Sequence, residues 1–344
     1  MKNFTLTPLL AALPLLLFTW GVSAQDIHYA QAGASPLNLN PALTGMFGGN
    51  QRFAANFRRQ WATVGEPYLQ VSGAYDLRFT NKKGHFKPWS ASLLFNHDQA
   101  GDAKLSFSQL GLGASYTHRL VPGKKTFLTF GMSGSAIQRS FDPNGLRFDD
   151  QYFLKEGFVG SQATGEFFEA TSKWLGEVST GVNLRILNDS SRTTLDIGAA
   201  AFHFNQPQKN FQDQLPTRLD SRFSVYVSSA WQMTKAFDLL FSITGQFQGA
   251  NRQALLGVGG LYHLSSKRTR ELALQLGGYY RAGDAFIPAV ALHFQAWQFH
   301  FSYDLNTSSL REASLGKGGP EVSVIYILKN VPVIPVCKTC PTHM

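Results

Sequence analysis

The chain has 344 residues, with 31 lysines and arginines against 22 aspartates and glutamates, which gives a formal net charge of +9. Glycine (32 residues) and phenylalanine (28 residues) are both abundant, a combination that suits closely spaced strands with an aromatic-rich outer surface. The sequence contains no basic helix or clustered basic patch, so the positive balance does not indicate a nucleic-acid partner. We expect a membrane or protein partner instead.

Residues 1–24 have the pattern of a secretory signal peptide. Lys2 supplies the positive charge, an apolar stretch runs from Leu9 to Trp20, and Val22-Ser23-Ala24 is a small-residue cleavage site. The apolar stretch is too short for a membrane anchor. No other long apolar segment follows, so membrane insertion would require a β-barrel.

Residues 25–50 do not have the pattern of a strand. Pro36 and Pro41 lack the N–H that a ladder needs, and Asn38, Asn40 and Gly45 favour turns. We predict an ordered cap or plug segment that folds inward at the start of the barrel. A plain linker is the alternative, because turn-forming residues are common in linkers.

Apolar and polar residues alternate through residues 51–328, most clearly in Trp297–Leu305. Because side chains on a strand alternate between faces, each such run presents one apolar wall and one polar wall. Fourteen runs qualify, and fourteen is an even number, as a closed antiparallel barrel of bacterial type requires. The predicted strands are 52–58, 69–78, 89–95, 110–116, 128–136, 177–186, 194–201, 222–232, 237–248, 253–264, 271–281, 285–294, 297–305 and 321–328.

The lengths of the connections separate a membrane barrel from a soluble sandwich. The long connections, 138–176, 205–220 and 306–319, all follow odd-numbered predicted strands, and the shortest follow even-numbered ones. Outer-membrane barrels have this arrangement, with short periplasmic turns and longer outer loops, whereas a sandwich has no reason for it. The fold class we predict is all-β: a transmembrane antiparallel barrel of about 14 strands, with both termini in the periplasm and residues 329–344 as a periplasmic tail.

Candidate chemistry is sparse. Asp142, Asp149 and Asp150 could hold calcium, although three carboxylates without a fixed spacing are more often a solvated loop. His203 and His300 could act as ligands or bases, but no nucleophile motif accompanies them, so lining the barrel is the favoured interpretation.

The two cysteines, Cys337 and Cys340, have half the ligands of a zinc site. A local disulfide or free thiols are therefore favoured over a metal. We expect no catalysis, no metal and no cofactor.

Several motifs, taken in order, resemble the PorP/SprF family. They are the stretch Ser35–Gly45 after Asp26, the run Phe57-Arg58-Arg59-Gln60-Trp61, and three later segments. The family-motif and cap residues are Pro36, Asn38, Asn40, Pro41, Gly45, Arg58, Gln60, Trp61, His203, Gln206, Pro207, Arg281, Ser302, Tyr303 and Asp304. The resemblance spans essentially the whole chain after the signal peptide. The ending His343-Met344 departs from the aromatic terminus typical of members.

The resemblance implies an outer-membrane component of the type IX secretion system of Bacteroidota, some members of which are tied to gliding motility. Such a protein would assist export or surface attachment of proteins with a C-terminal sorting domain, alongside periplasmic ring components. A channel for a small or apolar solute is the alternative, because a barrel of this size can enclose a lumen.

Basic residues gather in the predicted periplasmic turns. This candidate docking rim consists of Lys82, Lys83, Lys87, Lys124, Lys125, Lys235, Lys267, Arg268 and Arg270. A ring of one sign around a barrel mouth can steer an oppositely charged partner. Attraction to anionic head groups of the outer-membrane lipid is the plainer interpretation of the same pattern.

Overall fold

The computed structural model describes residues 26–63, 65–81, 86–153, 157–160, 162, 164–166, 168, 170–209, 211, 217–267 and 270–329. The predicted signal peptide and the cysteines Cys337 and Cys340 lie outside the described residues. So do three members of the predicted rim, Lys82, Lys83 and Arg268.

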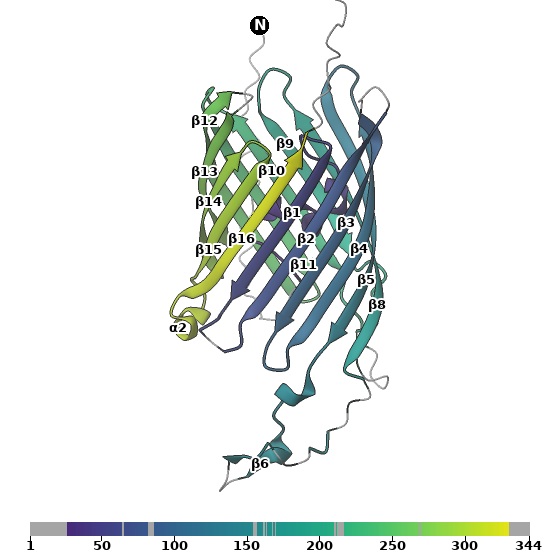
Figure 1. Cartoon of the computed structure of the whole chain (residues 1–344), viewed down its shortest axis with the longest axis vertical. Helices are drawn as coiled ribbons and strands as arrows, with labels where there is room; N and C mark the ends of the chain where they lie inside the picture. The colour runs from purple at the N-terminus through teal and green to yellow at the C-terminus, as the bar shows by residue number, and fades with distance from the viewer. Residues whose placement is uncertain are drawn as a thin grey trace, which may run out of the picture.

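Fourteen antiparallel strands form a closed barrel in which each strand pairs with its neighbours in the chain (Figure 1). The first and last strands close it, with Gln51 opposite Leu328 and Arg58 opposite Glu321. Closure leaves no strand edge unpaired. The barrel strands are β1 (Gln51–Gln60), β2 (Tyr68–Thr80), β3 (Phe86–Ala100), β4 (Leu105–Arg119), β5 (Lys125–Ser140), β8 (Ser172–Leu187), β9 (Thr194–Phe202), β10 (Arg222–Gln232), β11 (Phe237–Gln248), β12 (Asn251–Lys267), β13 (Arg270–Arg281), β14 (Ala285–Phe294), β15 (Trp297–Asn306) and β16 (Lys317–Leu328).

The structure confirms all fourteen predicted strands, and most extend by a few residues beyond their predicted bounds. The apolar wall of β15 faces outward, where Phe299 and Phe301 are 45% and 47% exposed. On its other face Ser302 and Asp304 are completely buried. The alternation is therefore inverted relative to a soluble protein, with apolar side chains outside and polar side chains inside, as a bilayer requires.

The two ends of the barrel differ in their connections. At the first, which we call the turn end, lie the start of β1, the end of β16 and the connections 81–85, 120–124, 188–193, 233–236, 268–269 and 295–296. At the other, the loop end, lie the three long connections 141–171, 203–221 and 307–316. The longest carries a small sheet that was not predicted, β6 (Tyr152–Phe153) with β7 (Gly157–Phe158). Figure 1 shows β6 well beyond the loop end, so its hairpin does not fill the barrel.

Aromatic side chains pair on the outer surface near the turn end. Ring centroids lie 4.6 Å apart for Phe53 and Tyr75, and 4.5 Å apart for Trp297 and Tyr326. Farther around the barrel, Trp89 and Tyr116 repeat the arrangement at 4.9 Å. Aromatic girdles of this kind mark the interface between hydrocarbon and head groups.

The helices are short and form no part of the barrel wall. They are η1 (Ala32–Ala34), α1 (Pro36–Leu39), η2 (Pro41–Leu43), η3 (Pro143–Gly145), η4 (Asp149–Gln151) and α2 (Leu310–Ser314). Within the described part of the chain, none of the helices has the length and apolarity needed to cross a bilayer. The first three belong to residues 26–50, which occupy the lumen.

Candidate functional site

Residues 26–50, which we call the lumen segment, pass through the interior of the barrel. The segment begins beside the loop end, where Asp26 contacts His203, and ends at the turn end, where Asn50 bonds Leu328. Pro36 and Pro41 occupy the first positions of α1 and η2. Proline suits these positions, because its fixed φ matches a helix and the N–H it lacks would have no partner there.

Five arginines of the barrel donate hydrogen bonds to main-chain carbonyls of the lumen segment. The donor–acceptor distances lie between 2.7 and 3.2 Å. The pairs are Arg58 with His28, Arg222 with Ile27 and Asn38, Arg52 with Leu43, Arg185 with Met46, and Arg78 with Phe47. The short turns of the segment satisfy only some of its carbonyls, and leaving the others unpaired in the interior would cost free energy.

Carboxylates of the barrel accept hydrogen bonds from main-chain N–H groups of the same segment. The two oxygens of Glu321 accept from Ala30 and Gln31 at 2.8 and 3.1 Å. Asp76 accepts from Gly45 at 2.7 Å. Gly45 has φ +74°, a left-handed conformation that glycine adopts without steric cost. That turn directs its N–H toward Asp76.

Four family-motif residues meet at Asp304, in the half of the lumen nearer the loop end. The Asp304 carboxylate accepts from Arg58 at 2.5 Å, Arg281 at 2.9 Å and Gln60 at 3.2 Å. The side chains of Arg58 and Asp304 are completely buried. Breaking such a pair leaves a buried charge without compensation, at a cost of about 3–5 kcal/mol.

An irregularity in the sheet accompanies this cluster. The register of β15 against β16 shifts between Asp304 and Leu305, and Tyr303 pairs with Pro320, which has no N–H to donate. A bulge bends a strand and redirects its side chains. The bulge beside Asp304 thus coincides with the carboxylate on which the three donors converge.

A second charged cluster holds the beginning of the lumen segment. Asp26 lies 2.8 Å from His203 Nε2 and 3.4 Å from Arg222 Nε, while His203 Nδ1 lies 3.4 Å from Glu177. Burial disfavours the imidazolium, but Asp26 and Glu177 outweigh burial and raise the pKa of His203 to about 9. Burial likewise opposes ionisation of Asp26, yet Arg222 and His203 hold the pKa of its carboxyl well below the usual value.

Asn40 anchors the middle of the segment to the barrel wall. Its Nδ2 donates to the carbonyls of Val182 and Ala199 at 2.9 and 3.2 Å, and its Oδ1 accepts from Ala42 N at 2.8 Å. The barrel residues that face this part of the segment are the glycines Gly131 and Gly181. A Cβ at Gly131 would collide with the main chain of residues 41 and 42, and one at Gly181 would collide with Asn40.

Asn38 makes a second side-chain anchor. Its amide pairs reciprocally with that of Asn96, with distances of 3.0 and 2.8 Å. Asn96 in turn contacts Gln109 at 2.7 Å. Both asparagines of the motif therefore serve the contact between segment and wall.

Four other motif residues lie apart from the lumen segment. Trp61 directly follows β1 and packs edge-on against Tyr68, with ring centroids 4.9 Å apart. Gln206 and Pro207 shape the connection after β9, where Gln206 N bonds the His203 carbonyl and the Pro207 carbonyl accepts from Leu219 N. Tyr303 lies on the outer face of β15, since its neighbours Ser302 and Asp304 point inward. Three of the motif residues, Trp61, His203 and Gln206, have left-handed backbone, with φ of 53°, 53° and 44°, a conformation unusual for residues other than glycine.

Several residues that hold the lumen segment were not predicted as site residues. They are Arg52, Asp76, Asn96, Arg185, Arg222 and Glu321, together with Glu177, which acts through His203. Their alternation pattern placed the charged ones inside the barrel. It could not show what they contact, because the partners lie in a segment far away in the sequence.

The candidate ligand residues have ordinary structural contacts. Asp142 accepts from Asn144 N, Asp150 accepts from Gly165 N, and His300 Nδ1 lies 3.0 Å from Gln31. Among the residues that the structure describes, no group of three or more histidines, cysteines or carboxylates is placed to hold a metal ion.

The sequence matches the model of one known protein family. The family model described as "Type IX secretion system membrane protein PorP/SprF" matches residues 21–326, nearly the whole chain. No curated protein matches the sequence.

Solved structures with a similar fold include two toluene transporters. The Ralstonia pickettii toluene transporter TbuX is 10% identical, with a TM-score of 0.49 over 85% of this chain and 92% of its own. The P. putida toluene transporter TodX is 11% identical, with a TM-score of 0.43 over 85% and 93%.

Proposed function

The chain belongs to the PorP/SprF family of type IX secretion system membrane proteins, and from this premise we propose that it is an assembly component rather than a conduit. In this role it assists export or surface attachment of proteins that carry a C-terminal sorting domain. In some members of the family this role is part of gliding motility. It does so by binding periplasmic ring components and outer-membrane partners on its surface.

The observation that carries this proposal is the way the lumen segment is held. Guanidinium groups and carboxylates of the barrel bind its main chain from the loop end to the turn end, and its own Asn40 side chain bonds the barrel wall between them. A segment held only by its ends could swing aside to open a path. One bound along its whole length favours a barrel that serves as a rigid platform.

The turn end is our candidate for the docking surface. Short turns face the periplasm in bacterial barrels, so we place this end there. Six members of the predicted rim lie among the described residues and are exposed: Lys87, Lys124, Lys125, Lys235, Lys267 and Arg270. Two carboxylates reduce the positive charge at this end by forming ion pairs. Asp189 lies 3.5 Å from Lys125, and Glu271 lies 3.4 Å from Lys329.

Charge reversal tests the docking role. We expect a variant with Lys124, Lys235 and Lys267 changed to Glu to insert normally but to lose most of its co-purification with periplasmic ring components, because rim charges set association rate and specificity. The matched control reverses Lys104, Arg311 and Lys317, three exposed cations of the loop end. Undiminished co-purification and cargo export in the turn-end variant would leave the rim without a docking role.

A channel for a small or apolar solute is the second candidate. Two cavities favour it because they provide room inside the barrel, one of them beside the lumen segment and the other nearer the turn end. The buried anchors of the segment argue against a continuous pore. Conductance across a planar bilayer separates the two candidates.

A further inference from the structure

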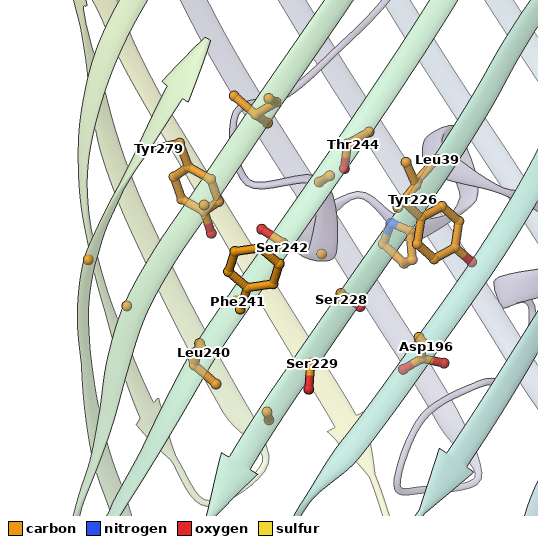
Figure 2. Close-up of a pocket in the computed structure, with 18 of the residues that line it drawn as sticks. Leu39, Asp196, Tyr226, Ser228, Ser229, Leu240, Phe241, Ser242, Thr244 and Tyr279 are labelled. Carbon is orange, nitrogen blue, oxygen red and sulfur yellow. The ribbon is translucent and has the colours of Figure 1, made fainter. Parts of the chain in front are cut away.

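Two cavities of about 350 and 370 Å³ lie along one side of the lumen. Figure 2 shows the first, between the lumen segment and strands β10 to β13, with Ser228, Ser242 and Tyr279 among its lining residues. The second lies nearer the turn end, where Lys329 and Gln295 border it. Pockets of this size are typical of small-molecule sites.

The two cavities follow one another along the same strands. On β12, Leu255, Gly257 and Gly259 line the first cavity, and the next lumen-facing residues, Leu261 and His263, line the second. On the antiparallel neighbour β13, Gly277 and Gln275 line the first cavity and Ala273 lines the second. Eight residue steps of strand separate Leu255 from His263, which is about 27 Å along the strand. We call the two cavities, which follow one another from the turn end into the barrel, the lane.

The inner cavity is lined by small and apolar residues together with the charged residues Arg52, Arg185 and Asp196 and several serines and threonines. On the barrel side the lining includes Gly257, Gly277 and Ala289, whose small side chains leave the lane open. On the opposite side, the lumen segment presents Leu39 and Met46. The lane ends at a packed cluster of Ala30, Leu255, Ala285 and Ile287, so it is closed toward the loop end.

The outer cavity has a larger share of charged and histidine side chains, beside Leu261, Leu272 and Ala273. Arg192 and Lys329 line it, and each is paired with a carboxylate, Asp238 at 2.7 Å and Glu271 at 3.4 Å. His263 and His293 line it as well. A ligand seated in the lane would therefore place an apolar part inside and a polar part at the mouth.

We propose that the lane binds a single-chain amphiphile, an alkyl chain with a polar head group, that enters from the turn end. An extended peptide suits the lane less well, because β10 to β14 are each paired on both sides and have no free ladder groups to satisfy its main chain. An alkyl chain needs no such partners. The proposal is independent of the secretion role.

Photolabelling tests it. The probe is a long-chain fatty acid with a diazirine in mid-chain, added to the full chain in lipid nanodiscs, with labelled residues mapped by mass spectrometry. We expect label on lumen-facing residues of β10 to β14, saturating near one probe per chain and displaced by unlabelled palmitate. Label confined to outward-facing residues would overturn the proposal, since it would report only the surrounding lipid.

Cavity-filling variants provide the control. Ala289→Phe and Ser228→Phe place a ring in the lane, whereas Val290→Phe and Val227→Phe place it on the outer face of the same strands. We expect lumen labelling to fall at least tenfold in the first pair and to persist in the second. Persistence in a folded lane-filled variant would refute the site. Two positions are used so that failure of one variant to fold does not prevent the test.

Chain length is a further readout. Burial strengthens binding roughly fourfold per added methylene group. In a lane closed at its inner end this gain must stop when the chain reaches the packed cluster. A rise that continues through the longest chains would indicate partitioning into lipid and would count against the site.

Discussion

In a helix or a sheet, main-chain N–H groups donate hydrogen bonds to the main-chain carbonyls. In the lumen segment, guanidinium groups of the barrel supply many of these donors. Arginine suits this task because its five N–H donors can serve a carboxylate and a carbonyl at once. Arg52 shows the arrangement, with Nε and Nη2 on Asp76 and Nη2 also on the Leu43 carbonyl. Each such charged hydrogen bond contributes about 1.5–3 kcal/mol.

The Asp304 carboxylate provides the sharpest test at the residue scale. We expect Asp304→Asn to lower the free energy of unfolding by about 3–5 kcal/mol, because Arg58 and Arg281 would lose their buried counter-charge. Urea unfolding in detergent, followed by heat-modifiable gel mobility, measures the change. The control Glu271→Gln removes an exposed pair with Lys329 and should change stability by about 0–1 kcal/mol. Similar losses in the two variants would contradict the assigned role of Asp304.

The Asp26–His203 contact predicts a pH dependence. The pKa of His203 is raised to about 9 from 6.5, so its stabilising contribution is complete below pH 6.5 and is lost as pH rises toward 9. The pKa of Asp26 is lowered, so its contribution is present above pH 3.8 and disappears only in strong acid. We expect the urea midpoint to fall between pH 6.5 and 9, and His203→Gln to flatten that fall. An equal fall in the variant would assign the effect to another group.

Neighbouring residues of β11 test which face meets lipid. Phe241 is exposed on the outer face, and Ser242 lies in the lumen. Phe241→Arg should cost about 2–4 kcal/mol at the bilayer midplane, and Ser242→Arg far less. Heat-resistant insertion into liposomes measures both. Equal impairment would mean that the face assignment is wrong.

At the scale of the element, the lumen segment is irregular and yet specific. Its three helices are each one turn, too short to be stable alone. Its shape therefore depends on the wall, through the glycines that admit its main chain and the side chains that bond it. This explains the part played by its two prolines and by Asn38 and Asn40: proline fixes φ, and each asparagine side chain bonds the barrel wall.

Removing both asparagines tests the segment as an anchor. Asn38→Ala with Asn40→Ala should lower the free energy of unfolding by about 1–3 kcal/mol per residue, since partners in the wall would be left unsatisfied. The urea midpoint reports the change, and Asn144→Ala in an exposed loop is the control. Unchanged stability together with lost secretion would instead indicate that the motif is a partner-binding strip.

At the scale of the whole molecule, the barrel is closed laterally by its strands and internally by the lumen segment. We expect the purified chain to show no steady conductance in planar bilayers. A variant with Arg58→Ala and Arg222→Ala, which loses contacts to Ile27, His28 and Asn38, should show intermittent openings. Steady conductance of the unaltered protein would favour the channel.

Much of the architecture follows from the sequence alone. Alternation with period two identifies a strand and its two faces locally, so the alternation by itself assigns Phe241 to one face and Ser242 to the other. The even number of strands and the segregation of long connections followed from the same local pattern. The resemblance carried by Asn38, Asn40, Arg58, His203 and Asp304 led to the family that the comparison confirms.

Only the tertiary structure decided what the polar wall binds. Arg58 and Asp304 are separated by most of the chain, and their meeting depends on β1 closing against β16. Likewise, Asp26 meets His203 only because the lumen segment folds back through the closed barrel. Strand periodicity is a property of neighbouring residues, whereas these contacts depend on barrel closure and on the path of an irregular segment. No local pattern encodes either one.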